Sequence, residues 1–299
     1  MLLLRLLLSL LLFPAFYVSA ETALPWNQPA DPQNCPASDD ALWLNYSGGQ
    51  ACIRYFSAGN LTAARYVVVI FRGDRDAYND AQPEAIPANT AEQQRQQAEK
   101  QARKLQLPVI IVARPGTYGS SGNHRHRRQP EEFLALNAAL DRLRARYGIQ
   151  QFVLSGHSGG ATAAAALLTL GRRDVACAVL TSGAYDLLRR AEQVRARLGR
   201  QPEPGTDLTG LTQPYDPLYH IAGIAADPDR QILVIGNPQD RVTPFTYQKT
   251  FVQALHAAGH QAQLIEWPTK PPQYHDMQGN ALVSTIARCW RENPPARLN

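Results

Sequence analysis

The stretch Gln151-Phe-Val-Leu-Ser-Gly-His-Ser-Gly-Gly-Ala-Thr-Ala-Ala-Ala-Ala-Leu-Leu168 begins with a short apolar run and continues into small residues that favour a helix. A strand that turns at once into a helix leaves space for glycine alone beside the turn, here at Gly156 and Gly160. Ser158 then projects at the apex. The bare G-x-S-x-G pattern arises by chance in roughly one chain in ten of this length. An ordinary glycine-rich turn is therefore the alternative, and the flanking strand and helix patterns favour a functional serine.

Apolar runs and helical patterns alternate along the rest of the chain. Residues 66–71, Tyr-Val-Val-Val-Ile-Phe, are continuously apolar, which is typical of a strand covered on both faces of a parallel sheet. Two partly apolar runs flank Ser-Gly-Gly-Gln at residues 47–50 and predict an edge hairpin. The alternation predicts a mostly parallel, doubly wound α/β sheet with helices on both faces. The expected strands are residues 41–46, 51–56, 66–71, 109–113, 151–154, 175–180, 231–235 and 261–267, and the expected helices are 89–105, 130–147, 161–170, 244–258 and 279–291.

Two long interruptions break this rhythm, at residues 73–87 and 187–229. Loops of that length in a compact domain are usually lids, binding loops or irregular surface segments. We interpret the second as a small cap over the site, with an irregular surface insertion as the alternative. Its arginines are expected on a solvated helix face rather than in a binding patch.

The first twenty residues have one early positive charge, a leucine-rich centre and a Val-Ser-Ala end. This pattern predicts a cleaved secretory signal at residues 1–20, with cleavage after Ala20 and a secreted or periplasmic product. An uncleaved anchor is the rival interpretation, because the apolar stretch approaches the length that spans a bilayer. Residues 21–299 are then expected to form a single α/β domain without stable membrane insertion.

The composition past the leader argues against nucleic acid as a partner. The net charge of +5 is modest and is spread along the chain, without a basic tail or a basic repeat studded with aromatic residues. Four cysteines in an exported chain are most simply two disulfides, for which three pairings exist. We favour Cys35 with Cys52 and Cys177 with Cys289. Because no two cysteines have C-x-x-C spacing, a metal role for them is weak.

A serine hydroxyl becomes a nucleophile when a base removes its proton and another group orients that base. Asp240 follows the apolar run 231–235, and His275 follows the run 261–267. Asp240 has the alternative of a turn or helix-capping role. His275 has the alternative of an ordinary loop histidine, with His260 as its main rival, but His260 precedes its strand and is expected at the opposite edge.

The order of Ser158, Asp240 and His275, each just after a strand, resembles the α/β-hydrolase superfamily. The spacing from acid to histidine is most similar to the esterase, dienelactone-hydrolase and prolyl-oligopeptidase-type branches, and the resemblance covers about residues 41–291. It implies an α/β-hydrolase fold in which Ser158 attacks, His275 transfers the proton and Asp240 orients the imidazole. It implies a small-molecule ester or short peptide as substrate, and neither a metal nor an organic cofactor.

The resemblance also implies two backbone N–H groups that stabilise the oxyanion formed during acyl transfer. One is expected from Gly159, the residue after the nucleophile. The other is expected from the loop after residue 71, where related proteins often have His-Gly and this chain has Arg72-Gly73-Asp74. This departure leaves the second donor open; we favour the N–H of Asp74, with Gly73 supplying the tight bend.

Residues 114–128, Arg-Pro-Gly-Thr-Tyr-Gly-Ser-Ser-Gly-Asn-His-Arg-His-Arg-Arg, follow another strand at the same edge. Their glycines and Tyr118 resemble the family loop that lies beside the active site. Three interpretations remain: a basic exposed loop, a metal site using its two histidines, and, with Arg72, an element that favours an anionic substrate. His157 adjoins the serine and cannot fold back as its base, so we expect it to pack or hydrogen-bond locally beside the substrate.

Three functions are compatible with these residues. The leading hypothesis is an exported serine hydrolase that cleaves carboxylic esters through an acyl-enzyme. A peptidase or amidase of prolyl-oligopeptidase type shares the order and approximate spacing of the three residues. A non-catalytic binding protein of the same fold is the alternative of another class, and the presence of Ser158, Asp240 and His275 argues against it.

Overall fold

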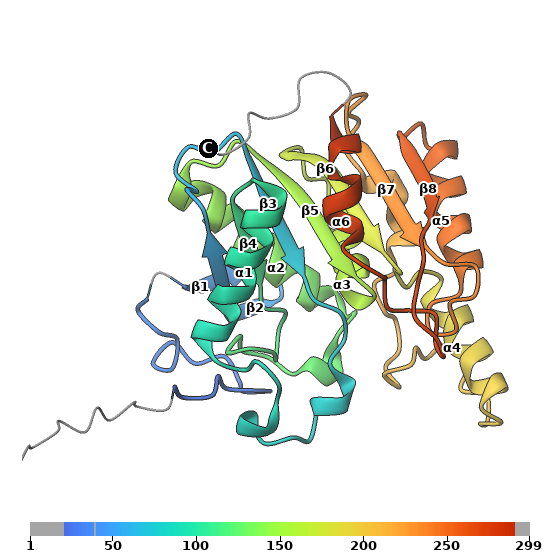
Figure 1. The fold of residues 1–299 in the computed structure, drawn as a ribbon. Helices are drawn as coiled ribbons and strands as arrows, with labels where there is room; N and C mark the ends of the chain where they lie inside the picture. Colours follow the sequence, from blue (N-terminus) through green and yellow to red (C-terminus); the bar gives the residue numbers. More distant parts are fainter. Residues whose placement is uncertain (1–20, 39, 291–299) are drawn as a thin grey trace, which may run out of the picture.

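The computed structural model describes residues 21–38 and 40–290. The expected signal at residues 1–20 and its cleavage site lie outside the described residues. An eight-stranded sheet forms the centre of the molecule, with the order β1-β2-β4-β3-β5-β6-β7-β8 (Figure 1). The strands are β1 (Ala41–Tyr46), β2 (Gly49–Ala58), β3 (Tyr66–Phe71), β4 (Val109–Val112), β5 (Gln151–His157), β6 (Val175–Thr181), β7 (Gln231–Gly236) and β8 (Ala262–Glu266).

The sheet is parallel from β4 to β8 and antiparallel where β2 pairs with β1 and β4. Adjacent residues of its central strands enter different cores: Val67 and Val69 pack in one hydrophobic cluster, and Val68 packs in the other. This double burial explains why the run at residues 66–71 is apolar without alternation. The expected mostly parallel α/β sheet is therefore confirmed.

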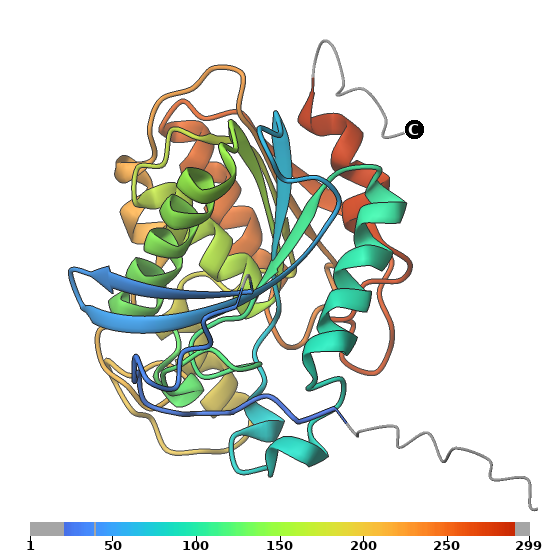
Figure 2. The same cartoon turned by 90° about the vertical axis from the view of Figure 1, so that its left-hand side faces the viewer.

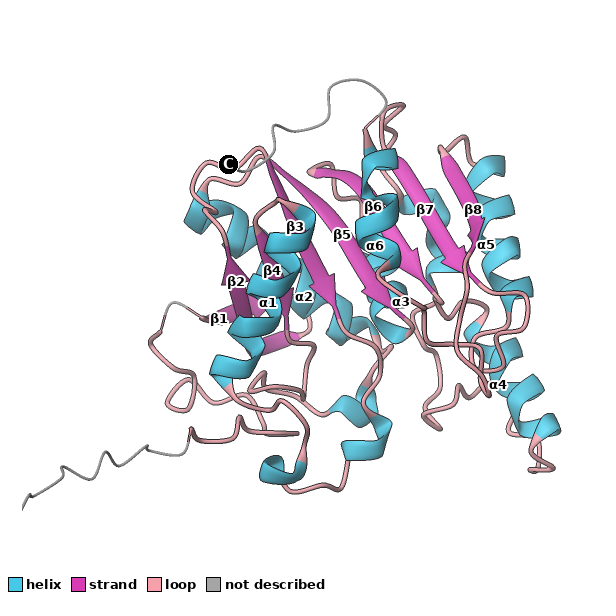
Figure 3. Ribbon diagram, in the orientation of Figure 1, coloured by secondary structure: helices cyan, strands magenta, loops and turns pink. Residues whose placement is uncertain are grey.

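Helices cover both faces of the sheet (Figure 2). One core takes residues from α2 (Pro130–Tyr147), α3 (Gly159–Thr169) and α5 (Phe245–Ala257), and the other takes residues from α1 (Ala91–Leu105) and α6 (Ala281–Thr285). The alanines of α3 are fully buried, so this helix can approach the sheet closely. The loops after the parallel strands gather at one edge, where the arrows end in Figure 3.

The ends of several elements differ from the sequence prediction. β5 continues three residues past the expected residue 154, up to the serine turn. The closing helix is shorter than the expected 279–291, because α6 ends at Thr285 and a 3-10 turn follows at Ile286–Cys289. This 3-10 turn ends at Cys289, which forms the disulfide with Cys177 of β6.

Two disulfides join the cysteine pairs that the sequence favoured. Cys35–Cys52 ties the N-terminal segment to β2, and Cys177–Cys289 ties β6 to the last turn. Within the described ranges no helix is both long and apolar enough to cross a bilayer.

The insertion at residues 187–229 contains α4 (Leu187–Arg197), an irregular stretch and a 3-10 turn at Pro217–Gly223. The sequence expectation of a solvated arginine face is wrong for part of α4. Arg190 and Arg195 are buried, whereas Arg189 and Arg197 are exposed. Arg195 is buried because it binds the irregular stretch, including the backbone oxygen of Asp207 at 2.6 Å.

Candidate active site

The turn between β5 and α3 presents Ser158 with φ 55° and ψ −124°, a strained backbone for a residue with a side chain. Glycine is required at two positions of this turn, because neighbouring backbone atoms leave no space for a Cβ. A Cβ at Gly156 would lie 2.2 Å from the carbonyl carbon of Gly160, and a Cβ at Gly160 would lie 2.2 Å from the backbone oxygen of Phe71. The chain therefore forms the sharp strand-to-helix turn that the glycine pattern predicts, with Ser158 at its apex.

The acid and the histidine meet across two neighbouring loops. Nδ1 of His275, after β8, lies 2.9 Å from Oδ2 of Asp240, after β7. The Asp240 carboxylate also accepts the N–H groups of Val242 and Thr243 at 2.8 Å and the Thr243 hydroxyl at 2.9 Å. Asp240 thus caps its own turn, the role given as its alternative, and binds the histidine as well.

These contacts set the charge of Asp240. Burial alone would raise the pKa of its carboxyl group, but the hydrogen bond and charge of His275 and the two backbone N–H groups outweigh burial and lower the pKa. An ionised Asp240 fixes the imidazole with its Nδ1 proton toward the acid. The other ring nitrogen is then the one that can act as a base.

The histidine loop is anchored on both sides. The N–H of Arg241 donates to the backbone oxygen of Gln273 at 2.9 Å, and the Ser182 hydroxyl donates to the backbone oxygen of His275 at 3.1 Å. The ring of His275 lies beside that of His157, with 4.8 Å between the ring centroids. Because His157 directly precedes Ser158, the histidine loop and the serine turn meet at the same edge of the sheet.

The loop after β3 packs against the serine turn. A Cβ at Gly73 would lie 3.2 Å from the backbone oxygen of His157 and 3.3 Å from Cβ of Ser158. Among the described residues, the N–H groups of Asp74 and Gly159 have no protein acceptor. Unpaired donors beside a nucleophile are the groups that an oxyanion hole requires.

The side chain of Asp74 has a role that the sequence did not predict. It forms ion pairs with Arg114 at 2.8 Å, with Arg127 at 3.3 Å and with Arg128. A Cβ at Gly159 would lie 1.9 Å from Oδ1 of Asp74, so the carboxylate is packed against the helix start next to the nucleophile. Burial would raise the pKa of Asp74, but the charges of Arg128, Arg114 and Arg127 hold it well below its usual range.

The arginines on Asp74 extend into a larger buried network. Arg114 also binds Glu132 at 2.6 Å, and Arg128 also binds Asp207 at 3.3 Å, which links α2 and the insertion to the site. Residues 114–128 are therefore not the basic exposed loop given as one interpretation. Arg114 already pairs with the carboxylates of Asp74 and Glu132, so the structure does not support its part in the anionic-substrate interpretation.

Tyr118 is buried, and its ring lies against two arginine side chains. The guanidinium groups of Arg72 and Arg75 lie 5.4 and 5.9 Å from its ring centroid, and Arg72 donates to Gln94 at 2.9 Å. Arg72 thus packs on Tyr118 and binds α1 through Gln94. In the parts of the chain that the structure describes, no group of three or more His, Cys, Asp or Glu side chains is placed to hold a metal ion.

The two loop histidines have different environments. His124 is buried, and its Nε2 accepts the N–H of Arg75 at 3.1 Å. Burial, with the nearby charge of Arg114, lowers the pKa of His124 to about 3. His126 is exposed on the rim of a cleft on the other side of this loop.

His157 stays beside the site in a local network, as expected. Its Nδ1 lies 3.2 Å from the hydroxyl of Thr181, which itself donates to the backbone oxygen of Gly156 at 2.9 Å. Burial first and the neighbouring His275 second lower the pKa of His157 to about 4. The ring is therefore neutral at physiological pH.

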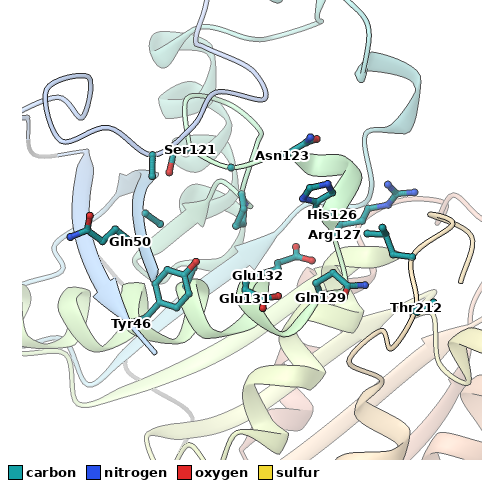
Figure 4. A pocket seen from close by; sticks show the side chains of 16 residues that line it. Tyr46, Gln50, Ser121, Asn123, His126, Arg127, Gln129, Glu131, Glu132 and Thr212 are labelled. Atoms are coloured by element: carbon teal, nitrogen blue, oxygen red, sulfur yellow. The ribbon is translucent and has the colours of Figure 1, made fainter. Parts of the chain in front are cut away.

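Two clefts open near these loops. One of about 390 Å³ borders the serine turn through Gly73 and His157, and Arg72, Arg75 and Asp276 also line it. The other, of about 420 Å³, lies between the β1–β2 hairpin, α2 and the 114–128 loop (Figure 4). Its labelled side chains are Tyr46, Gln50, Ser121, Asn123, His126, Arg127, Gln129, Glu131, Glu132 and Thr212. Ser158, Asp240 and His275 are not among the residues that line either cleft.

The order of the strands and the serine turn after β5 define an α/β-hydrolase fold. Solved structures agree at low sequence identity. The esterase Pf2001 of Pyrococcus furiosus matches with a TM-score of 0.58 and 15% identity over 89% of this chain and 96% of that one. Est1E of Butyrivibrio proteoclasticus matches with a TM-score of 0.51 and 11% identity over 84% and 95%.

A larger protein shares the same fold over part of its length. The acylaminoacyl peptidase of Pyrococcus horikoshii matches with a TM-score of 0.54 and 11% identity, over 86% of this chain but 42% of the peptidase. The present chain therefore spans less than half of that protein. No protein-family model matches the sequence, and a comparison with curated proteins gave no relative.

Proposed function

We propose that the protein is an exported serine hydrolase that cleaves carboxylic esters through a Ser158-His275-Asp240 triad. The observation that carries this proposal is the 2.9 Å contact of His275 with Asp240 beside the strained turn of Ser158. The esterases among the similar folds support the reaction class. The leader-like N-terminal sequence and the two disulfides support export.

In the proposed mechanism His275 removes the proton of Ser158 while the serine oxygen attacks the acyl carbon. Asp240 keeps the imidazole oriented and stabilises its positive charge. The N–H groups of Gly159 and Asp74 stabilise the oxyanion. His275 then gives the proton to the departing alcohol, and water attacks the acyl-enzyme by the reverse sequence of proton transfers. No step needs a metal or an organic cofactor.

The substrate is proposed to reach Ser158 under the insertion at residues 187–229, which acts as a small cap. Its attachment to the catalytic edge supports this role: Arg190 donates to the backbone oxygen of Val242 at 2.9 Å, and Arg128 pairs with Asp207. The described residues between 21 and 290 then form one domain with the cap inserted between β6 and β7.

A peptidase or amidase is the second candidate, because an acylaminoacyl peptidase shares the fold. The discriminating experiment compares turnover of 4-nitrophenyl acyl esters with that of peptide anilides. Ester turnover at least about a hundredfold above anilide turnover, about 2.7 kcal/mol in the barrier, supports the esterase.

The catalytic proposal itself is tested with a fluorophosphonate probe. Wild type is expected to become labelled, and Ser158→Ala is expected to lose the label because the nucleophile is gone. Ser155→Ala, at a buried serine in β5 before the turn, is the matched control and keeps the label. Equal labelling of wild type and Ser158→Ala contradicts the proposal and leaves a binding protein as the explanation.

A further inference from the structure

Arg190 in the first turn of α4 is a buried cation that the mechanism above does not use. Its side chain is 6% exposed, and its Nε donates to the backbone oxygen of Val242 at 2.9 Å. Val242 belongs to the turn that holds the catalytic acid, since its N–H donates to Asp240 at 2.8 Å. The insertion therefore places this guanidinium directly against the acid loop.

Arg190 differs from every other buried arginine in the described ranges. Seven of the eight have a carboxylate within 4.0 Å, and Arg190 has none. A guanidinium has five N–H donors, and only one of those of Arg190 is used by the described residues. A buried charge without a counter-ion is costly for a folded protein, so a missing partner at this place needs an explanation. The paired arginines are Arg54, Arg114, Arg127, Arg128, Arg172, Arg195 and Arg230.

The carboxylates whose charges act on Arg190 are already bound elsewhere. Burial first and the charge of Arg128 second lower the pKa of Arg190 to about 10, while Asp74, Asp207 and Asp240 raise it. Asp74 and Asp207 pair directly with other arginines, and Asp240 pairs with His275. Arg190 therefore remains charged at neutral pH and lies within the electrostatic field of both the oxyanion loop and the acid loop.

The free nitrogens of Arg190 face space that solvent can enter. Its two terminal nitrogens have no partner among the described residues, yet neither is among the buried polar atoms that are sealed from solvent without a partner. A planar guanidinium with both terminal nitrogens free has the geometry for bidentate binding of a carboxylate.

We propose that Arg190 binds a carboxylate of the substrate and so makes anionic esters the preferred substrate class. This inference rests on the proposed function. It favours a single carboxylate over a doubly charged phosphate, because the charges of Asp74, Asp207 and Asp240 already act on Arg190. The carboxylate can belong to the acyl chain or to the alcohol, and the two cases need different substrates.

The test uses two matched pairs of substrates. The first is 4-nitrophenyl hydrogen glutarate against its methyl ester, which places the anion in the acyl chain. The second is 4-acetoxybenzoate against methyl 4-acetoxybenzoate, which places it in the leaving group. The measured quantity is the ratio of kcat/KM for the anionic to the neutral member in wild type, Arg190→Met, Arg190→Lys and Arg189→Met.

We expect Arg190→Met to lower this ratio by about 10- to 100-fold for one of the two pairs, the loss expected for a hydrogen-bonded charge pair. The pair affected identifies the side of the ester that carries the anion. Arg190→Lys keeps the positive charge but lacks the planar guanidinium group, and we expect a smaller drop in the ratio than for Arg190→Met. Arg189→Met removes an exposed arginine from the same helix and is expected to leave both ratios unchanged. Equal ratios in wild type and both Arg190 variants overturn the proposal.

A binding measurement separates this result from a failure of the proposed function. Free glutarate is expected to raise the Tm of wild type and Arg189→Met and to raise that of Arg190→Met less. If the protein neither labels with the fluorophosphonate nor hydrolyses any ester, the esterase proposal fails while the binding of glutarate still tests Arg190. Equal stabilisation of wild type and Arg190→Met by glutarate overturns the role of Arg190 in either case.

Discussion

The proposed catalytic centre lies between two regions that are built differently. The histidine wall, residues 236–244 and 268–278, has one buried carboxylate, Asp240, which hydrogen-bonds to its own turn and to His275. The arginine wall, residues 72–76 and 114–128, has one buried carboxylate, Asp74, which pairs with three arginines. Both acids have a lowered pKa, but Asp240 is bound by N–H groups, a hydroxyl and one imidazole, whereas Asp74 is bound by three guanidinium groups.

The difference indicates which wall is expected to affect the reaction and which is expected to affect the stability of the fold. In the histidine wall a few hydrogen bonds orient the proposed base, so we expect a defect there to change the reaction and leave the core intact. In the arginine wall the carboxylate pairs with arginines that also bind α2 and the insertion, and only its backbone N–H is proposed to take part in the reaction. A defect there is expected to change the stability of the fold, because an unpaired buried charge is left behind.

Asp240→Asn gives the largest expected effect and tests the histidine wall. The amide keeps the size of the side chain but can leave the imidazole in the wrong tautomer, which costs about 10⁴-fold in kcat for a serine triad. Steady-state ester hydrolysis measures the loss, and circular dichroism checks that the fold is kept. Asp229→Asn, an exposed acid just before β7, is the control and retains full activity. A drop below tenfold for Asp240→Asn contradicts its role.

Much of the histidine wall and of the serine turn could be predicted from the sequence. Ser158, Asp240 and His275 each follow an apolar run, and parallel strands place such positions at one edge of the sheet. Glycines at Gly156 and Gly160 indicated the close approach that the structure requires. These signals are local, because each depends on a strand and the few residues that follow it.

The arginine wall could not be predicted in the same way. Arg114 and Arg128 stand 40 and 54 positions after Asp74, and nothing in their neighbourhood indicates which acid they meet. A dense basic run is usually solvated, so the sequence favoured exposure for residues 114–128 and for α4. These charges are buried because folding brings distant partners to them. Neither the composition nor the periodicity of the sequence indicates which residues those partners are.

Asp74→Asn tests the arginine wall and has the next largest effect. Removing this charge leaves Arg114, Arg127 and Arg128 short of a partner, so we expect a loss of about 3–5 kcal/mol in the free energy of unfolding at pH 7. Urea denaturation measures it. The backbone N–H proposed for the oxyanion is retained, so the protein that remains folded is expected to keep most of its kcat. A loss of activity without a loss of stability contradicts this division of roles.

The pH dependence of Asp74→Asn follows from the sign of the pKa shift. The folded-state pKa of Asp74 lies well below 3.8, so its stabilisation is complete above the unfolded pKa and is lost as the pH falls toward the folded one. The difference between wild type and variant is expected to shrink below about pH 5. Asp76→Asn is the matched control, because Asp76 is half exposed and burial raises its pKa. It is expected to change stability by less than about 1 kcal/mol.

His157→Asn has the smallest expected effect. It tests the serine turn between the two walls. Because the pKa of His157 is lowered to about 4, its ring carries no charge in an assay above pH 5, and its removal leaves the charge around His275 unchanged. We expect kcat/KM to fall less than about tenfold and the acid limb of its pH profile to stay in place.

The pH dependence of the free energy of unfolding is a second test of His157, and here a difference between wild type and variant is expected. A histidine whose folded pKa lies below its ordinary 6.5 favours folding while neutral, so wild type loses this contribution as the pH falls from 6.5 toward 4. His157→Asn cannot take up that proton and is expected to lose less stability over the same interval, measured by urea denaturation at each pH. If the acid limb moves instead by about one unit, the ring of His157 affects the reaction through its charge, and the prediction of a neutral packing role is wrong.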